Sequence, residues 1–285
     1  TVFGRVTPDQ KKKLVEAMKR AGHTVAMTGD GVNDVLALRE ADCSVSMASG
    51  SAAARNVSEI VLADNDFSHM PEVVAEGRRS INNLQRSASL FLVKTVFTAV
   101  LALICIFMPP YPFIPIQMSL ISTAVIGIPS FVLALEPNHE RIRGNFLANV
   151  LARSLPASLA IVCALFAELA LGRLLDHSFA EISTVCMMIT VVIGLALIYR
   201  ISRPLTPLRS ALLVAMSGLV LLSYTVFGEF FHVVRLAPDV AVFTVVLAAL
   251  SITLFEWTSR IFLANYEQSV LFARVVRFVE GKDGK

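Results

Sequence analysis

The sequence predicts an α-helical membrane bundle of six transmembrane helices, preceded by a partial α/β half-domain of the Rossmann-like kind. Hydrophobic residues make up 55% of the 285 residues, which is more than soluble globular proteins carry. Beyond residue 86 the chain holds six apolar segments of roughly the twenty residues that span a bilayer. Before residue 70, short β-branched runs alternate with helical patterns, as in α/β folds.

The first helix is predicted to begin at Pro8 and to end at Gly22. Thr7 and Gln10 have the spacing of a capping box, proline suits the first helical position, and glycine suits the end. Lys11 then lies in the first turn, where a positive charge opposes the helix dipole. A contact with an anion would explain a lysine at this position. The alternative is a solvated surface charge, which is the usual role of a lysine in a run of three.

The stretch from Met27 to Asp34, MTGDGVND, follows the short apolar run from Thr24 to Met27. That run reads as a buried strand whose carboxyl end delivers Asp30 into a turn, which is where ligands bind in open α/β sheets. We expect Thr28, Gly29 and Gly31 to form a loop that lets the backbone approach a phosphate group closely.

Asp30 and Asp34 lie four residues apart, with the amide of Asn33 between them. Hard oxygen ligands suit Mg²⁺, which takes one or two carboxylates together with a phosphate oxygen. We therefore predict a Mg²⁺ site at Asp30 and Asp34. The structural alternative is an ordinary Gly-Asp-Gly turn followed by Asp34 as a helix N-cap.

Four further elements complete the predicted half-domain of residues 1–70. They are a short helix from Val35 to Ala41, a strand from Cys43 to Met47, a helical turn from Ala52 to Val57 and a strand from Glu59 to Leu62. This amounts to half of a doubly wound domain and is too short to fold well alone.

The TGDGVND string resembles the hinge motif of P-type ATPases, the phosphorylated ion pumps of the haloacid dehalogenase superfamily. Residues 3–11, FGRVTPDQK, and Asn82-Asn83 before a long apolar helix resemble two further segments of that family. The resemblance implies that Lys11 contacts the phosphoryl group and Asp30 binds Mg²⁺. It also implies that Asn33 and Asp34 order the loop, and that ATP is the substrate.

Other segments of the family have no counterpart, including the Asp-Lys-Thr-Gly-Thr segment with its aspartate nucleophile and the nucleotide-binding domain. We therefore expect the chain to be the C-terminal portion of a pump, completed by an N-terminal part of the same protein. By itself it is predicted to be inactive.

A stalk helix is predicted at residues 71–86, the membrane domain at 87–257 and a tail at 258–285. The six spans are placed at Ser87 to Met108, Phe113 to Leu135, Leu155 to Leu175, Ile182 to Tyr199, Ser210 to Phe227 and Asp239 to Trp257. Stalk and first span form one unbroken helical pattern, which would couple the α/β segment to the bilayer.

Basic residues gather in alternate loops, as the positive-inside rule requires. Those assigned to the cytosolic side are Arg141, Arg143, Arg153, Arg200, Arg203, Arg209, Arg260, Arg274, Arg277, Lys282 and Lys285. We predict a plasma-membrane protein with residues 1–86 and the C-terminus in the cytosol. A net charge of +3 gives no reason to expect nucleic acid, and the four scattered cysteines indicate neither disulfides nor a metal cluster.

A transport path is expected where polar groups interrupt the first two spans. Ser119, Ser122 and Thr123 recur at helical spacing on one face, and Gly127 with Pro129 would break the helix and free backbone carbonyls for a cation. Hydroxyls that join membrane helices are the alternative.

Lys94 and Thr98 lie one turn apart in the first span, and Glu168 lies at mid-depth in the third. An intramembrane ionisable residue is a functional candidate by default, but Lys94 could equally snorkel to the cytosolic face.

Our favoured interpretation of the sequence is an ATP-driven cation pump with an aspartyl-phosphate cycle. Compared with the calcium-pump pattern that the sequence resembles, the acidic positions of the first two spans fall on Thr98 and Ile126, and neither residue is a carboxylate. A lipid or polyamine translocase of the same family is the second alternative, because Lys94 in place of an acid would be less unusual there. A membrane-anchored phosphatase of the dehalogenase kind is the third alternative.

Overall fold

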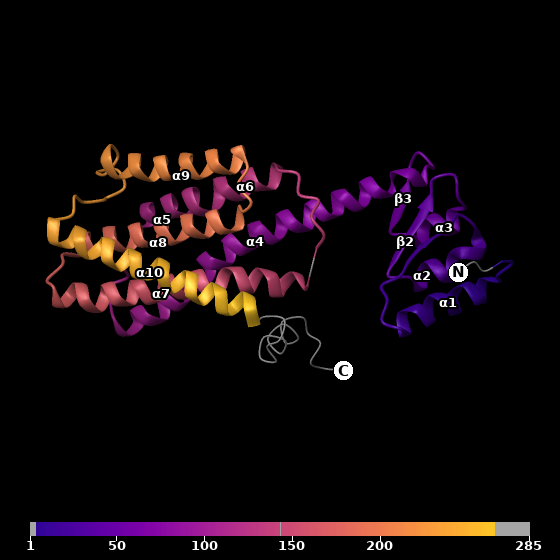
Figure 1. The fold of residues 1–285 in the computed structure, drawn as a ribbon, viewed down its shortest axis with the longest axis horizontal. Helices are drawn as coiled ribbons and strands as arrows, with labels where there is room; N and C mark the ends of the chain where they lie inside the picture. Colours follow the sequence, from indigo (N-terminus) through magenta and orange to yellow (C-terminus); the bar gives the residue numbers. More distant parts are fainter. Residues whose placement is uncertain (1–3, 143, 266–285) are drawn as a thin grey trace. The chain divides into compact units, whose positions relative to one another are not determined.

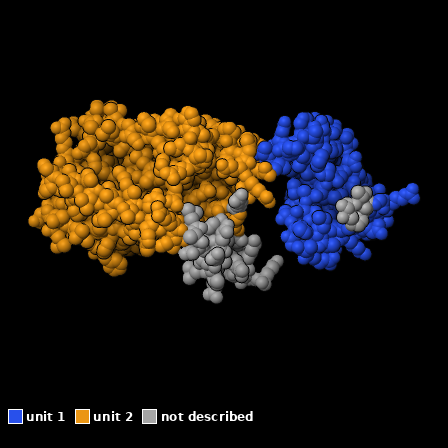
Figure 2. All heavy atoms as spheres, in the orientation of Figure 1, with its two compact units in different colours: residues 1–75 blue, residues 76–285 orange. Residues whose placement is uncertain are grey.

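The computed structural model describes residues 4–142 and 144–265, and Figure 1 traces their elements in chain order. The chain divides into two compact units, residues 1–75 and residues 76–285, which are coloured separately in Figure 2. Residues 266–285, most of the predicted tail, lie outside the described residues.

The first unit opens with helix α1, Pro8–Arg20. Its capping box is present, because the Thr7 N–H donates to Gln10 Oε1 at 3.0 Å and the Gln10 N–H to Thr7 Oγ1 at 3.4 Å. The helix ends before Gly22, whose φ of +85° is a left-handed conformation that suits glycine. The predicted start and end of this helix are confirmed.

Three parallel strands form the sheet of the first unit, in the order β1-β2-β3. They are β1 Ala26–Thr28, β2 Cys43–Met47 and β3 Ile60–Leu62, with Thr28 beside Val45 and Met47 beside Leu62. The crossovers carry the 3₁₀ turn η1 Val32–Asp34, helix α2 Val35–Glu40 and helix α3 Ala52–Val57, and the turn η2 Phe67–His69 follows. Every element predicted for this unit is present.

Asp42 holds the chain at the entry to strand β1. Its Oδ2 accepts the Val25 N–H at 2.9 Å, and Lys19 Nζ lies 3.4 Å from its Oδ1. The hydrogen bond from Val25, with a smaller contribution from the Lys19 charge, keeps the pKa of Asp42 below its ordinary value. This carboxylate therefore favours the folded unit only while it is ionised.

Helix α4 begins at Met70 and runs without interruption to Phe107. It is followed by α5 Pro115–Ile121, the π-helical segment η3 Ser122–Gly127, α6 Ile128–Leu135, α7 Phe146–Leu174, α8 Phe179–Ile201, α9 Pro207–Thr225 and α10 Pro238–Asn265. Counting α5, η3 and α6 as one, six helices of the described chain are long and apolar enough to cross a membrane. The predicted six-helix bundle is confirmed.

Helix α8 is the most buried of the six, and it packs against α7, α9 and α10 (Figure 1). Large apolar side chains point outward from the surrounding helices, among them Phe107, Leu174 and Val214. Such an exposed apolar surface suits lipid rather than water.

The expected break in the second span is wrong, because Gly127 and Pro129 do not unwind the helix. The backbone widens into the π-helical segment η3 instead, and the Ile128 N–H reaches back five residues to the Thr123 carbonyl. Proline supplies no backbone N–H donor, and a π-helical segment lets the chain stay helical in spite of that. Gly194 of α8 leaves room for it, since a Cβ there would lie 2.4 Å from Val125 Cγ1.

Candidate functional site

The loop after strand β1 presents Asp30 at the carboxyl end of the sheet. Strand β2 and the segment behind it fix this loop, because the Gly29 N–H donates to the Val45 carbonyl at 3.0 Å and the Asp30 carbonyl accepts the Ser51 N–H at 2.7 Å. The Asp30 side chain itself is exposed. The backbone is thus held while the carboxylate stays accessible.

Two glycines allow the close approaches that shape this loop. A Cβ on Gly29 would lie 2.5 Å from Cβ of Asp34, and a Cβ on Gly50 would lie 2.9 Å from the carbonyl oxygen of Asp30. Neither distance is sterically possible, so both positions require glycine. Gly29 is part of the predicted loop. Gly50 was missed, although a glycine directly beyond a buried strand was a signal for it.

Lys11 and Asp34 form an ion pair, with Lys11 Nζ 2.6 Å from Asp34 Oδ1. The other carboxylate oxygen of Asp34 accepts the Gly31 N–H at 3.3 Å. The lysine side chain is 34% exposed and the aspartate side chain 12% exposed. Because both its oxygens are engaged, Asp34 holds the Lys11 ammonium beside the loop that carries Asp30.

The residues present fit a Mg²⁺ ion at Asp30. Its carboxylate is exposed and makes no hydrogen bond or ion pair within the described residues. Thr28, expected in the loop, is instead the last residue of β1, and Asn33 lies in the turn η1; both side chains are exposed. Residues 4–142 and 144–265 hold no cluster of three or more His, Cys, Asp or Glu side chains, but Mg²⁺ needs only one or two carboxylates when a phosphate supplies further oxygens. Ligation by Asp34 as well stays a prediction.

In the second unit, the structure brings Lys94 of α4 to the junction of α5 and η3. Lys94 Nζ donates to Ser122 Oγ at 2.6 Å, and that hydroxyl donates to the Met118 carbonyl at 2.6 Å. Thr98 Oγ1 donates to the Lys94 carbonyl at 2.6 Å. The ammonium is thus bound to the neighbouring helix within the bundle. This contact favours a role in the path over snorkelling, and the role itself stays a prediction.

Ser119 and Thr123 are exposed in the second unit, and each hydrogen-bonds within its own helix. Ser119 Oγ donates to the Pro115 carbonyl at 3.2 Å, and Thr123 Oγ1 donates to the Ser119 carbonyl at 2.9 Å. Of the three predicted hydroxyls, only Ser122 contacts Lys94.

Glu168 lies elsewhere, fully buried in α7, with its Oε1 3.1 Å from Nδ1 of His177. Gly172 makes room for this pair, since a Cβ there would lie 2.8 Å from Glu168 Oε1. Sequence reasoning missed His177, because it lies beyond the helix end and no spacing rule links it to Glu168.

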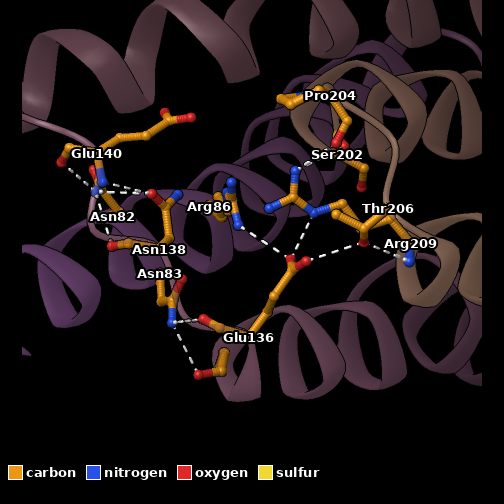
Figure 3. A network of polar contacts seen from close by, with 11 residues as sticks. Asn82, Asn83, Arg86, Glu136, Asn138, Glu140, Ser202, Pro204, Thr206 and Arg209 are labelled. Carbon is orange, nitrogen blue, oxygen red and sulfur yellow. Dashed lines mark hydrogen bonds and ion pairs between the residues drawn. The ribbon is translucent and has the colours of Figure 1, made fainter.

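A second polar cluster, shown in Figure 3, joins α4 to the C-terminal end of α6 and to the N-terminal end of α9. The buried Glu136 carboxylate accepts Arg209 Nε at 2.6 Å and Thr206 Oγ1 at 3.0 Å, and Arg86 Nη1 lies 3.7 Å from it. Asn83 Nδ2 donates to the Glu136 carbonyl at 3.1 Å. We call Arg86, Glu136 and Arg209 the Glu136 cluster. The sequence singled out Asn82-Asn83 but not this buried ion pair.

Fold and site together define a six-helix membrane protein whose N-terminal unit presents an accessible aspartate and a lysine–aspartate ion pair at the carboxyl end of a parallel sheet. Comparison with known families adds that residues 1–42 match the haloacid dehalogenase-like hydrolase family.

The more specific likeness is to cation-transporting ATPases. The chain is 43% identical over 222 residues to the probable cation-transporting ATPase exp7 of Streptococcus pneumoniae, an alignment that covers 75% of this chain and 28% of the relative. It is 44% identical over 234 residues to the calcium-transporting ATPase CtpE of Mycobacterium bovis, covering 77% and 29%. A calcium-transporting ATPase of Arabidopsis thaliana is 38% identical over 135 residues, covering 46% and 13%.

The resemblance to P-type cation-transporting ATPases of the haloacid dehalogenase superfamily is thereby confirmed. The chain spans less than a third of the length of these relatives.

Proposed function

We propose that this chain is the C-terminal part of an ATP-driven pump that moves a cation across a plasma membrane through an aspartyl-phosphate cycle. The observation that carries the proposal is the Lys11–Asp34 ion pair beside the accessible Asp30, at the carboxyl end of a parallel sheet. The names of the relatives add that the transported substrate is a cation.

In this proposal the first unit stabilises charge on a transferring phosphoryl group. Lys11 supplies a fixed positive charge, because Asp34 holds its ammonium in place at 2.6 Å. The glycine-flanked backbone around Asp30 lets the phosphoryl group approach. A Mg²⁺ ion bound at Asp30 would neutralise phosphate oxygens and bridge them to the protein. The aspartate nucleophile and the ATP-binding surface would come from the N-terminal part of the same protein.

The continuous helix α4 supports a mechanical role in the proposed pump. It carries polar residues in its first half and Lys94 in its second, over 38 residues without a break. A rod of this kind would transmit movement of the phosphorylated part to the bilayer. We propose that the path it controls includes Lys94, Thr98 and Ser122, with Ser119 and Thr123 on the same helix as Ser122.

We propose Ca²⁺ as the first cation to test. Of the two relatives with 43% and 44% identity, the second is named a calcium-transporting ATPase. Lys94, Thr98 and Ser122 carry no carboxylate, and hydroxyls alone bind a divalent ion weakly. We therefore expect acidic ligands from spans outside this chain and few ions moved per cycle.

We call the protein of which this chain is proposed to be the C-terminal part the longer protein. The test is ATP-dependent uptake of ⁴⁵Ca²⁺ and other labelled cations into vesicles that contain the longer protein. Uptake that requires ATP and Mg²⁺ supports the pump. ATP-driven movement of a labelled lipid or polyamine without any cation would favour the translocase, and phosphatase activity without transport would favour the membrane-anchored phosphatase.

A further inference from the structure

Arginine side chains converge at one end of the six-helix bundle. Two cavities of ≈250 Å³ and ≈490 Å³ adjoin there, because Arg200 and Arg203 line both. We call them together the arginine pocket, and its basic residues are Arg86, Arg153, Arg200, Arg203 and Arg260. Two carboxylates, Glu140 and Glu256, also line it. Five arginines against two glutamates leave an excess of positive charge.

The residues of the pocket come from four helices and the segment after α8. Arg86 lies inside α4, Arg153 near the start of α7 and Arg260 near the end of α10, while Arg200 lies in the last turn of α8 and Arg203 follows that helix. Arg153, Arg200, Arg203 and Arg260 are among the basic residues that the positive-inside rule assigns to the cytosolic side. The pocket therefore opens where the headgroups of a bilayer would lie.

Arg86 is the buried arginine of the pocket, and it shares the Glu136 carboxylate with Arg209. The residue is only 6% exposed, yet its Nη1 has no hydrogen-bond acceptor within the described residues and lies 3.7 Å from Glu136 Oε2. A buried charged donor without an acceptor is costly, so such groups are normally satisfied. Because Arg86 also lines the smaller cavity, an anion bound there would lie near a guanidinium whose nearest carboxylate is already hydrogen-bonded by Arg209.

Two arginines of the pocket are already oriented by neighbouring side chains. Arg200 Nη1 lies 3.0 Å from Glu256 Oε2, and its guanidinium carbon lies 5.8 Å from the centre of the Phe255 ring. The guanidinium of Arg203 stacks on the Tyr199 ring at 4.5 Å. Stacked and paired guanidiniums lose less freedom when they bind phosphate oxygens in their planar fork geometry.

We propose that the arginine pocket binds the phosphate headgroup of an anionic phospholipid. Basic pockets between membrane helices suit such headgroups, and arginine pairs well with phosphate. A lipid fits better than a free anion because α10, which carries Glu256 and Arg260 of the pocket, also exposes apolar and aromatic side chains. Trp257 is 61% exposed and Ile261 is 38% exposed, each adjacent in the sequence to a residue that lines the pocket. Acyl chains could lie along this surface while the headgroup contacts the arginines.

The proposal depends on the helices crossing a bilayer and not on ATP hydrolysis, so it can fail or succeed independently of the proposed pump. The test uses the full chain in nanodiscs made of equal parts phosphatidylglycerol and phosphatidylcholine. After detergent extraction, native mass spectrometry counts the lipids that stay bound. We expect retained phosphatidylglycerol that millimolar inorganic phosphate does not displace.

The variants are Arg203→Gln and Arg260→Gln, both exposed residues whose replacement should leave the fold intact. Each should weaken phosphatidylglycerol retention roughly fivefold, as removal of one interfacial basic residue typically does. Arg235→Gln is the matched control, because this exposed arginine precedes α10 at its other end.

Three results would overturn the proposal. These are equal retention of phosphatidylcholine, loss of the lipid to inorganic phosphate, and an Arg235→Gln effect as large as that of Arg203→Gln.

Discussion

The Lys94 ammonium lies 2.6 Å from the Ser122 hydroxyl, which joins α4 to the start of the π-helical segment η3. This hydrogen bond places a positive charge between two membrane helices at the point where the second helix changes its geometry. If the proposed cation path passes here, the ammonium repels a bound cation at close range.

Lys94→Ala in the longer protein should therefore raise the apparent affinity for the transported cation about tenfold, the effect of removing a modest charge repulsion. Cation-stimulated ATPase activity measured across a cation titration gives this affinity. Thr95→Ala is the control, because Thr95 is exposed on the same helix and its hydroxyl donates to the Phe91 carbonyl of that helix. An unchanged affinity in Lys94→Ala would remove this lysine from the path.

Ser122→Ala tests whether Lys94 acts through its contact with Ser122. If it does, the effects of Lys94→Ala and Ser122→Ala should not add, because each removes the same hydrogen bond. Additive effects on the apparent cation affinity would show that the two residues act separately.

Asp34→Asn should slow phosphorylation of the longer protein through its effect on Lys11. The pair is charged and its carboxylate is largely buried, so loss of the negative charge frees the ammonium to move. We expect a rate about tenfold lower, against about a hundredfold for Lys11→Met, which removes the stabilising charge itself. Rapid-quench measurement of the phosphorylation rate separates the two. A full loss in Asp34→Asn that persists at saturating Mg²⁺ would contradict positioning as its role.

Glu136→Gln should destabilise the membrane bundle by about 3–5 kcal/mol, because it leaves Arg86 and Arg209 buried without their shared carboxylate. Both arginines are 6% exposed. Thermal unfolding in detergent, followed by the single tryptophan, measures the loss. Glu76→Gln is the control, since its ion pair with Arg79 is solvent-exposed and should contribute less than about 1 kcal/mol. Equal thermal stability of the two variants would mean that the Glu136 cluster does not stabilise the bundle.

The elements of this fold were accessible from the sequence because their signals are local. The capping box at Thr7, the β-branched run before Asp30 and the length of the apolar segments each depend on neighbours in the chain. The π-helical segment was not predicted. Proline and glycine indicate that a helix is disturbed, but they do not indicate whether it unwinds or widens. The space for the π-helical segment comes from Gly194, a residue of another helix, where a Cβ would collide with Val125.

The candidate site was predicted in part for the same reason. Asp30, Asp34 and Lys11 lie in recognisable patterns, and the structure adds that Lys11 and Asp34 touch. Long-range partners could not be foreseen. Arg209 lies 73 residues from Glu136 in the sequence, and no periodicity connects residues so far apart.

The isolated chain should neither hydrolyse ATP nor become phosphorylated, because an aspartate nucleophile is required for an acyl-phosphate and no strand before Asp30 offers one in this sequence. The chain is incubated with γ-³²P-ATP and Mg²⁺, with the longer protein as positive control. Hydroxylamine-labile phosphate on the isolated chain would refute this prediction.

The central claim is that Asp30 serves Mg²⁺-dependent phosphorylation in an ATP-driven cation pump, and Asp30→Asn in the longer protein tests it most directly. The measurement is the rate of hydroxylamine-labile phosphorylation from γ-³²P-ATP across a Mg²⁺ titration, with the exposed Asp9→Asn as control. We predict that Asp30→Asn keeps nucleotide binding and loses about a hundredfold in rate, while Asp9→Asn matches the unmodified protein. A normal rate with normal Mg²⁺ dependence in Asp30→Asn would contradict the account and leave Asp30 as a turn residue.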